Sequence, residues 1–121
     1  MTSTSSVSYA SFYPGDDYVD WVALDGYNRN TNRTFDELFA PSLRELGALA
    51  RKPIMIAEIG TASFASADAR ADFLRSTFGQ DLPEKYPQVR AVLYFMNSRD
   101  VDLRVDSRAA EAFAASVAGD Y

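Results

Sequence analysis

Three short apolar runs, separated by stretches with helical spacing, constrain the fold of this chain more than any other feature. The runs fall at Tyr18 to Asn28, Pro53 to Gly60 and Val89 to Asn97. Each is mostly continuous in its apolar character, which is typical of strands in parallel sheets that are covered on both faces. The runs therefore predict three buried strands of one parallel sheet.

A helix is predicted between the first and second runs. Thr34 and Glu37 have the spacing of a capping box, in which each side chain bonds to the backbone of the other residue. The apolar residues that follow recur on one side as far as about Arg51. Pro41 lies inside this pattern, so we expect a kink or a break there.

Two further helices complete an alternating order of strands and helices. The second is expected from near Ser66 to about Phe78, with Gly79 as its C-terminal stop, and the third after Asp106 or Ser107. The order strand, helix, strand, helix, strand, helix with short connections is typical of α/β proteins, in which helical crossovers join parallel strands.

Composition excludes several kinds of chemistry. The 121 residues suit one domain at most, against the ~250 residues of a full eightfold barrel. There is no cysteine and no histidine, so acid–base chemistry must use Asp, Glu, Tyr or Lys, and Ser-His-Asp mechanisms and His- or Cys-based zinc sites are excluded. A net charge of −5 without a basic stripe disfavours nucleic acid as a partner.

The N-terminus has no targeting pattern. Residues 1–8 are rich in Ser and Thr, with neither the basic region nor the apolar core of a signal peptide, and no apolar run approaches the ~20 residues of a membrane span. Taken literally, the chain is expected in the cytoplasm unless a leader lies upstream. Residues 1–12 are expected to be a disordered segment.

Polar side chains stand directly at the ends of the predicted strands, where functional groups of βα units collect. Glu58 is the outlier, because it ends an almost wholly apolar strand and burying its charge is costly without partners. Its position leaves a catalytic and a structural role equally open. Asp25 fits the capping of a turn better than a functional role. Tyr27 either donates a hydrogen bond to Glu58 across adjacent strands or simply packs.

An acidic cluster follows the third strand. Asp100, Asp102 and Asp106 crowd one loop, and such a cluster raises the question of calcium binding. The spacing matches no calcium loop, so we expect a solvated or substrate-facing loop and no metal site.

Several segments together resemble one enzyme family. The segments are Tyr13 to Asn28 with its Asp25-Gly26-Tyr27-Asn28 ending, Thr34 to Leu49, Pro53 to Gly60, Ala91 to Asn97, and Asp102 to Ser107. They resemble the sixth strand, the helix after it, the seventh strand, and the eighth strand with its loop in glycoside hydrolase family 26. That family contains β-1,4-mannanases, some mixed-linkage glucanases and β-1,3-xylanases. The combination is more specific than any single segment.

The resemblance implies a partial (β/α)8 TIM barrel. Residues 13–121 would be its C-terminal part, with three βα units that hold strands six to eight. The implied reaction is the retaining hydrolysis of β-1,4-mannosidic linkages in mannan, with Glu58 as nucleophile and Tyr27 as the tyrosine that supports it. The acid/base glutamate of the family belongs on the fourth strand, outside this chain.

The resemblance also implies the residues that bind substrate. They are Tyr94, Phe95, Asn97 and Asn28. Family members often carry tryptophan on the eighth strand, where this chain has Tyr94-Phe95, and at the position of Leu103. Because aromatic rings bind sugars by stacking, smaller or absent rings weaken a subsite or change its preference.

Three interpretations of function follow. The first is a fragment of a secreted mannan-degrading glycosidase, inactive in isolation because its acid/base residue is missing; a β-glucanase or xylanase of the same family is its alternative. The second is a truncated, inactive remnant or weak carbohydrate-binding module, which self-associates through its open sheet edges. The third, an unrelated nucleotide-binding domain, is disfavoured because no Gly-rich phosphate loop follows any strand. The expected partner is a β-linked, mannan-type polysaccharide, with no cofactor and no membrane.

Overall fold

Three strands form one parallel sheet in the computed structural model, which describes residues 8–64, 66 and 68–118. The strands are β1 (Val22–Asn28), β2 (Ile54–Thr61) and β3 (Val89–Tyr94), and they lie side by side in chain order. The predicted α/β class with three parallel strands is confirmed. Strands β1 and β3 are shorter than the apolar runs that predicted them, whereas β2 has the predicted length and is shifted by one residue.

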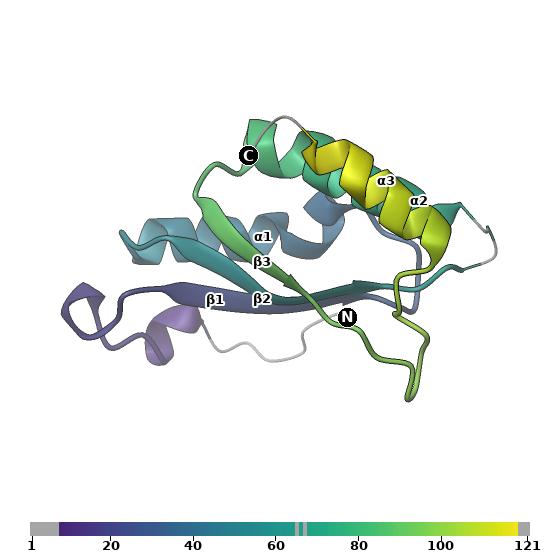
Figure 1. The fold of residues 1–121 in the computed structure, drawn as a ribbon. Coiled ribbons are helices and arrows are strands. Elements are labelled where there is room, and N and C mark those ends of the chain that lie inside the picture. Colours follow the sequence, from purple (N-terminus) through teal and green to yellow (C-terminus); the bar gives the residue numbers. More distant parts are fainter. Residues whose placement is uncertain (1–7, 65, 67, 119–121) are drawn as a thin grey trace.

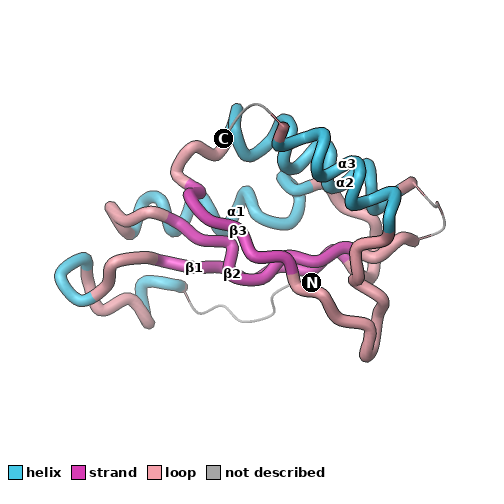
Figure 2. Tube along the Cα trace, in the orientation of Figure 1, coloured by secondary structure: helices cyan, strands magenta, loops and turns pink. Residues whose placement is uncertain are grey.

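The α-helices lie on one side of this sheet (Figures 1 and 2). The helical elements are η1 (Tyr9–Ser11), η2 (Asp16–Tyr18), α1 (Phe35–Leu49), α2 (Ala69–Ser76), η3 (Thr77–Lys85) and α3 (Ser107–Val117). Of these, η1 and η2 are short 3-10 helices that precede β1, and η3 is a π-helix that continues α2. The other side of the sheet carries no α-helix among the residues described.

Only one face of the sheet is covered, although the apolar runs predicted cover on both. In β1, Val22 and Leu24 are buried in the core, whereas Ala23 and Asp25 are exposed. On β3, Leu93 is 53% exposed. The prediction is therefore wrong for the described residues, because no described α-helix lies over the second face (Figure 1). We call this uncovered side, which carries Ala23, Asp25 and Leu93, the open face.

Helix α1 has the predicted start. Thr34 Oγ1 accepts from the backbone N of Glu37 at 3.2 Å, and Glu37 Oε2 accepts from the backbone N of Thr34 at 2.8 Å. The expected break at Pro41 does not occur, since the helix runs from Phe35 to Leu49. Pro41 is exposed, so the carbonyl that loses its helical partner there can bond to water.

The sequence predicted that the second helix would stop at Gly79, but the helical path does not end there. The helical path continues from α2 through η3 to Lys85. Gly79 lacks the positive φ of a helix-ending glycine. It lies against α3 instead, where a Cβ would stand 3.6 Å from that of Ser116. The predicted start of α3 is confirmed, because Asp106 Oδ1 accepts from the backbone N of Ala109 at 2.8 Å.

Regular structure begins upstream of the boundary expected at residue 12. Residues 1–7 of that segment lie outside the described residues. Ser8 Oγ and the backbone N of Tyr9 both donate to Glu45 Oε1 on α1, at 2.9 and 2.8 Å. The Tyr9 hydroxyl also lies 2.8 Å from Ser42 Oγ. These contacts fix η1 against α1.

The core lies between the sheet and the helices. Its largest fully buried apolar side chains are Phe35, Phe39, Leu43, Ile54, Ile56, Ile59 and Leu74. They come from α1, β2 and α2, so the central strand is held from one side by two helices.

Candidate active site

An extra residue in β2 turns Glu58 toward the open face. Leu24 pairs with Ile56 and Asp25 with Glu58, so β2 takes two steps where β1 takes one. The β3 register shifts in the same stretch of β2. Such a bulge reverses the alternation of a strand between its two faces. Ile56 and Ile59, three positions apart, are therefore both fully buried, and Glu58 between them is only half-buried. Because the bulge keeps the Glu58 carboxylate out of the core, the energetic cost of burying its charge is avoided.

Gly26 places Tyr27 on the same open face. A Cβ at Gly26 would stand 2.4 Å from Phe39 Cζ of α1, so only a hydrogen fits between strand and helix. Because side chains alternate along a strand, Asp25 and Tyr27 on either side of Gly26 point away from the helices. Asp25 thus lies within strand β1, so the turn-capping role that the sequence favoured is wrong.

The Tyr27 hydroxyl donates a hydrogen bond to Glu58 Oε2. The sequence left open whether Tyr27 would bond or only pack, and the structure shows the bond. A hydrogen bond to a carboxylate is charge-assisted and stronger than one between neutral groups. It holds one oxygen of Glu58 and leaves the second oxygen available to a reacting atom. This arrangement suits a carboxylate nucleophile.

A cavity of about 260 Å³ opens beside Tyr27, and Glu58 is not among its lining residues. Tyr27 and Phe95 line it, with ring centroids 5.6 Å apart and an edge-to-face angle of 71°. Arg29 lines it as well, with its guanidinium carbon 4.4 Å from the centroid of the Tyr27 ring. Asn97 is a further lining residue. Of the four residues predicted to bind substrate, Phe95 and Asn97 are therefore at the cavity.

Tyr94, a third predicted substrate-binding residue, turns toward the core. Its hydroxyl accepts a hydrogen bond from the backbone N of Thr61 at 3.1 Å, and its ring packs against the buried cluster. Burial raises the pKa of Tyr94 above its ordinary value. In this position Tyr94 joins β3 to the end of β2 and does not line the cavity.

Asn28, the fourth, is fully buried. Its Nδ2 donates to Thr61 Oγ1 at 3.1 Å and to Asn32 Oδ1 at 3.3 Å, and its Oδ1 accepts from the backbone N of Arg33 at 2.8 Å. These bonds occupy the carboxamide with neighbouring protein groups. Asn28 therefore anchors the loop between β1 and α1 and does not line the cavity.

The loop from β3 to α3 closes one side of the cavity. The backbone N of Leu103 donates to the carbonyl of Asn97 at 2.7 Å, which folds the loop back on itself. Leu103 is only 4% exposed and rests on Gly60 at the end of β2. A Cβ at Gly60 would stand 3.0 Å from Leu103 Cδ1, so Leu103 packs closely against the backbone of Gly60.

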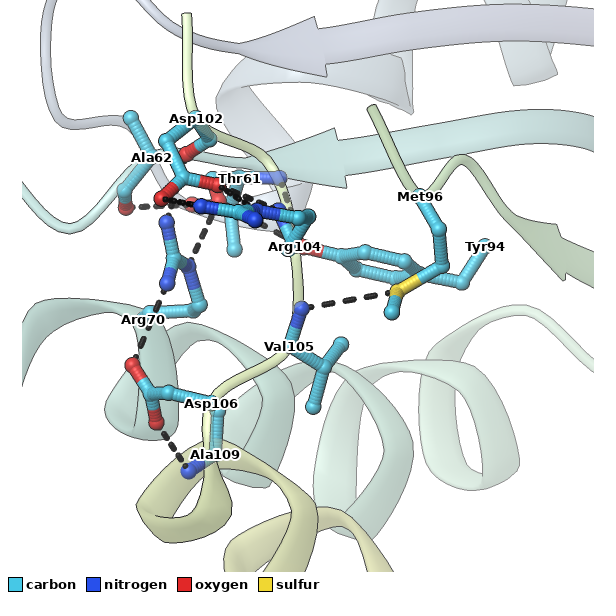
Figure 3. Close-up of polar contacts among 10 residues, drawn as sticks. All are labelled: Thr61, Ala62, Arg70, Tyr94, Met96, Asp102, Arg104, Val105, Asp106 and Ala109. Atoms are coloured by element: carbon cyan, nitrogen blue, oxygen red, sulfur yellow. Dashed lines mark hydrogen bonds and ion pairs between the residues drawn. The ribbon is translucent and has the colours of Figure 1, made fainter. Parts of the chain in front are cut away.

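Arg70 holds the loop between β3 and α3 in place (Figure 3). The sequence alone did not single out this residue. The side chain is 5% exposed. Its Nε donates to the carbonyl of Thr61 at 3.0 Å, Nη2 to the carbonyl of Asp102 at 2.5 Å, and Nη1 to Asp106 Oδ2 at 3.1 Å. One buried guanidinium thus joins the last residue of β2 to the loop after β3. An arginine among apolar helix residues was the signal that could have revealed it.

The acidic cluster is divided between arginines and the cavity. Arg104 bonds to Asp102 and holds the pKa of Asp102 at about 2. Asp106 is occupied by Arg70, and Asp100 lines the cavity. Over residues 8–64, 66 and 68–118, no group of three or more His, Cys, Asp or Glu side chains is arranged to hold a metal ion. No helix in the same part of the chain is long and apolar enough to cross a membrane.

The chain is similar in sequence to Endoglucanase H of Acetivibrio thermocellus. The two are 32% identical over 118 residues, which cover 92% of this chain and 13% of the endoglucanase. No family model matches the chain. Because the chain spans only that small share of its relative, the whole protein's activity does not transfer with the match. The similarity relates this chain to part of a glycoside hydrolase.

Proposed function

We propose that this chain belongs to the catalytic domain of a retaining glycoside hydrolase of family 26, with Glu58 as its nucleophile. The observation that carries the proposal is the hydrogen bond from Tyr27 to Glu58, made on the open face beside an aromatic-lined cavity. The match to an endoglucanase supports the reaction class. The resemblance of the strand endings to family 26 supports the family.

The open face fits the interior of a barrel. In a (β/α)8 barrel the helices form an outer ring, and alternate side chains of each strand point inward. Here the α-helices of the described residues lie on one side, while Asp25, Tyr27 and Glu58 point to the other. We therefore propose that residues 13–121 supply strands six to eight, with the open face turned toward the barrel axis.

Retaining hydrolysis needs two carboxyl groups about 5–5.5 Å apart. Glu58 would attack the anomeric carbon and form a glycosyl ester, while the second carboxyl protonates the departing glycosidic oxygen. That second group would then take a proton from water, which cleaves the ester. We propose that it is a glutamate of the fourth barrel strand, supplied by polypeptide beyond these residues.

Two substrate classes are supported by different observations. The strand endings resemble those of mannanases, which favours β-1,4-mannan. The relative is named an endoglucanase, which favours a β-glucan. Phe95 offers an aromatic surface for either sugar ring at the cavity. Mannan is the first candidate, and β-glucan the second.

A mechanism-based label tests the nucleophile. Dinitrophenolate leaves without protonation, so a 2,4-dinitrophenyl 2-deoxy-2-fluoro-β-mannobioside needs no acid residue, and the fluorine slows release of the ester. We expect a mass increase of one 2-deoxy-2-fluoromannobiosyl group that maps to Glu58 and is absent from Glu58→Gln. The matching cellobioside reports the preference between mannan and glucan. Labelling that persists in Glu58→Gln would overturn the proposal.

Polysaccharide hydrolysis gives a second test. General acid assistance contributes roughly 10²–10⁴-fold to rate, so the 121 residues alone are expected to release no detectable sugar from mannan or β-glucan. A robust rate that Glu58→Ala abolishes would show that the acid lies within this chain. Titration with mannohexaose addresses the non-catalytic alternative, because a simple binding module would bind it whether or not Glu58 is present.

A further inference from the structure

We infer that Arg29 is a positioning residue, whose positive charge holds the Tyr27 ring in the orientation that donates to Glu58. The guanidinium carbon of Arg29 lies 4.4 Å from the centroid of the Tyr27 ring. At this distance a cation is attracted to the face of an aromatic ring. The catalytic meaning of the inference rests on the proposed function, whereas the contact itself does not.

Tyr27 needs such a support because of where it stands. It is the penultimate residue of β1, an edge strand, and its ring lies on the open face, which no described helix covers. Two side chains make aromatic or cation–π contacts with the ring among the described residues. Phe95 approaches with an edge-to-face angle of 71°, and Arg29 approaches near its face. Together they restrict the ring from the end of β3 and from the residue just after β1.

Charge gives Arg29 a role that packing alone would not. A cation beside the ring stabilises negative charge that develops on the phenol oxygen, so it strengthens the hydrogen bond that this oxygen donates. Within the described residues Arg29 forms no ion pair with a carboxylate. Its charge is therefore not neutralised by a partner there. At a partly exposed ring the interaction changes an equilibrium by roughly two- to fivefold.

Tyrosine labelled with ¹³C at Cζ in the full 121-residue chain tests the inference by NMR. The chain has seven tyrosines, and Tyr27→Phe assigns the resonance of Tyr27. We expect Glu58→Gln to shift this resonance by removing the charged acceptor. We expect Arg29→Met, which keeps the apolar stem without the charge, to shift it too. Arg29→Lys, which restores a cation, should return it toward the wild-type position.

A double variant separates a positioning role from a direct effect of charge on the ring. If Arg29 acts through the hydrogen bond, Arg29→Met should shift the resonance less in the Glu58→Gln background than in wild type. The six other tyrosine resonances report that each variant is folded. Arg33→Met, from the same loop, is the matched control and should leave the Tyr27 resonance in place.

Three results would overturn the inference: an unmoved resonance in Arg29→Met, a shift of equal size in both backgrounds, or no response to Glu58→Gln. None of these readouts depends on catalysis. If the resonance behaves as expected but the fluorosugar fails to label Glu58, the proposed function fails while the positioning contact stands. If Glu58 is labelled and the resonance ignores Arg29, only the inference fails.

Discussion

Asp25 on β1 lies directly opposite Glu58 on β2, and both carboxylates face the uncovered side of the sheet. Like charges that face each other on neighbouring strands destabilise a sheet. We expect Asp25→Asn to raise the free energy of unfolding by roughly 0.2–1 kcal/mol near neutral pH. Urea unfolding followed by circular dichroism measures the change. Asp20→Asn, at an exposed position before the strand, should have almost no effect, and a less stable Asp25→Asn would contradict the expected repulsion.

Gly26 and Gly47 give a matched pair of substitutions. Gly26→Ala forces a methyl group against the ring of Phe39, so we expect a loss of about 1–3 kcal/mol from overpacking. Gly47 lies inside α1 with open space around the added Cβ. There the alanine should stabilise by about 0.5–1 kcal/mol, because glycine loses more backbone freedom in a helix. Thermal unfolding of both variants measures the two changes in stability. Equal effects would show that the approach of Phe39 to β1 is not as close as described.

Removing Arg70 should loosen the cavity wall. Arg70→Met removes the hydrogen bonds that the guanidinium donates to the carbonyls of Thr61 and Asp102, and we expect a loss of about 1–3 kcal/mol in stability. Hydrogen exchange at the Leu103 amide should quicken, since this loop loses its anchor. Arg75→Met breaks an ion pair whose arginine is 60% exposed and should change stability by less than about 0.5 kcal/mol. Equal losses in the two variants would refute a special role for Arg70.

The Asp36 carboxylate makes the free energy of unfolding depend on pH. Hydrogen bonds from Lys85 and Tyr86 hold the pKa of Asp36 below its ordinary 3.8. This stabilisation is fully present above that ordinary value and is lost as pH falls through the lowered pKa. We expect Asp36→Asn to be less stable than wild type at pH 7, by a modest amount because the pair is partly exposed. The difference should narrow below about pH 3.8 in urea unfolding, and a constant difference down to pH 2 would count against the linkage.

Local signals in the sequence predicted local structure well. The capping box at Thr34 depends on residues three apart, and the structure has it. The apolar runs predicted three parallel strands, although β3 holds no buried residue and one face of the sheet is not covered by an α-helix. Pro41 was misjudged, because the cost of a proline depends on whether the freed carbonyl meets water, and Pro41 lies on the exposed side of the helix.

Features that depend on distant parts of the chain were not predictable in the same way. Arg70 bonds to groups up to 36 positions away, and no pattern near it names them. The division of Tyr94 and Phe95 between core and cavity follows from where β3 ends. Glu58 was singled out because it is a charged residue in an apolar strand. The direction of its side chain follows from the register shift in β2, and the spacing of apolar residues in the sequence does not reveal that shift.

The single extra residue in β2 makes the length of this strand as important as its composition. If Ala57 stayed in the strand and the bulge were straightened, Glu58 would fall in line with Ile54 and Ile56 and point into the core, away from Tyr27. If Ala57 were deleted instead, Glu58 would directly follow Ile56, and simple alternation would keep Glu58 on the open face and Ile59 in the core. Loss of this one codon is therefore the change of length that β2 should accommodate best, because it removes the bulge and leaves both side-chain directions as they are.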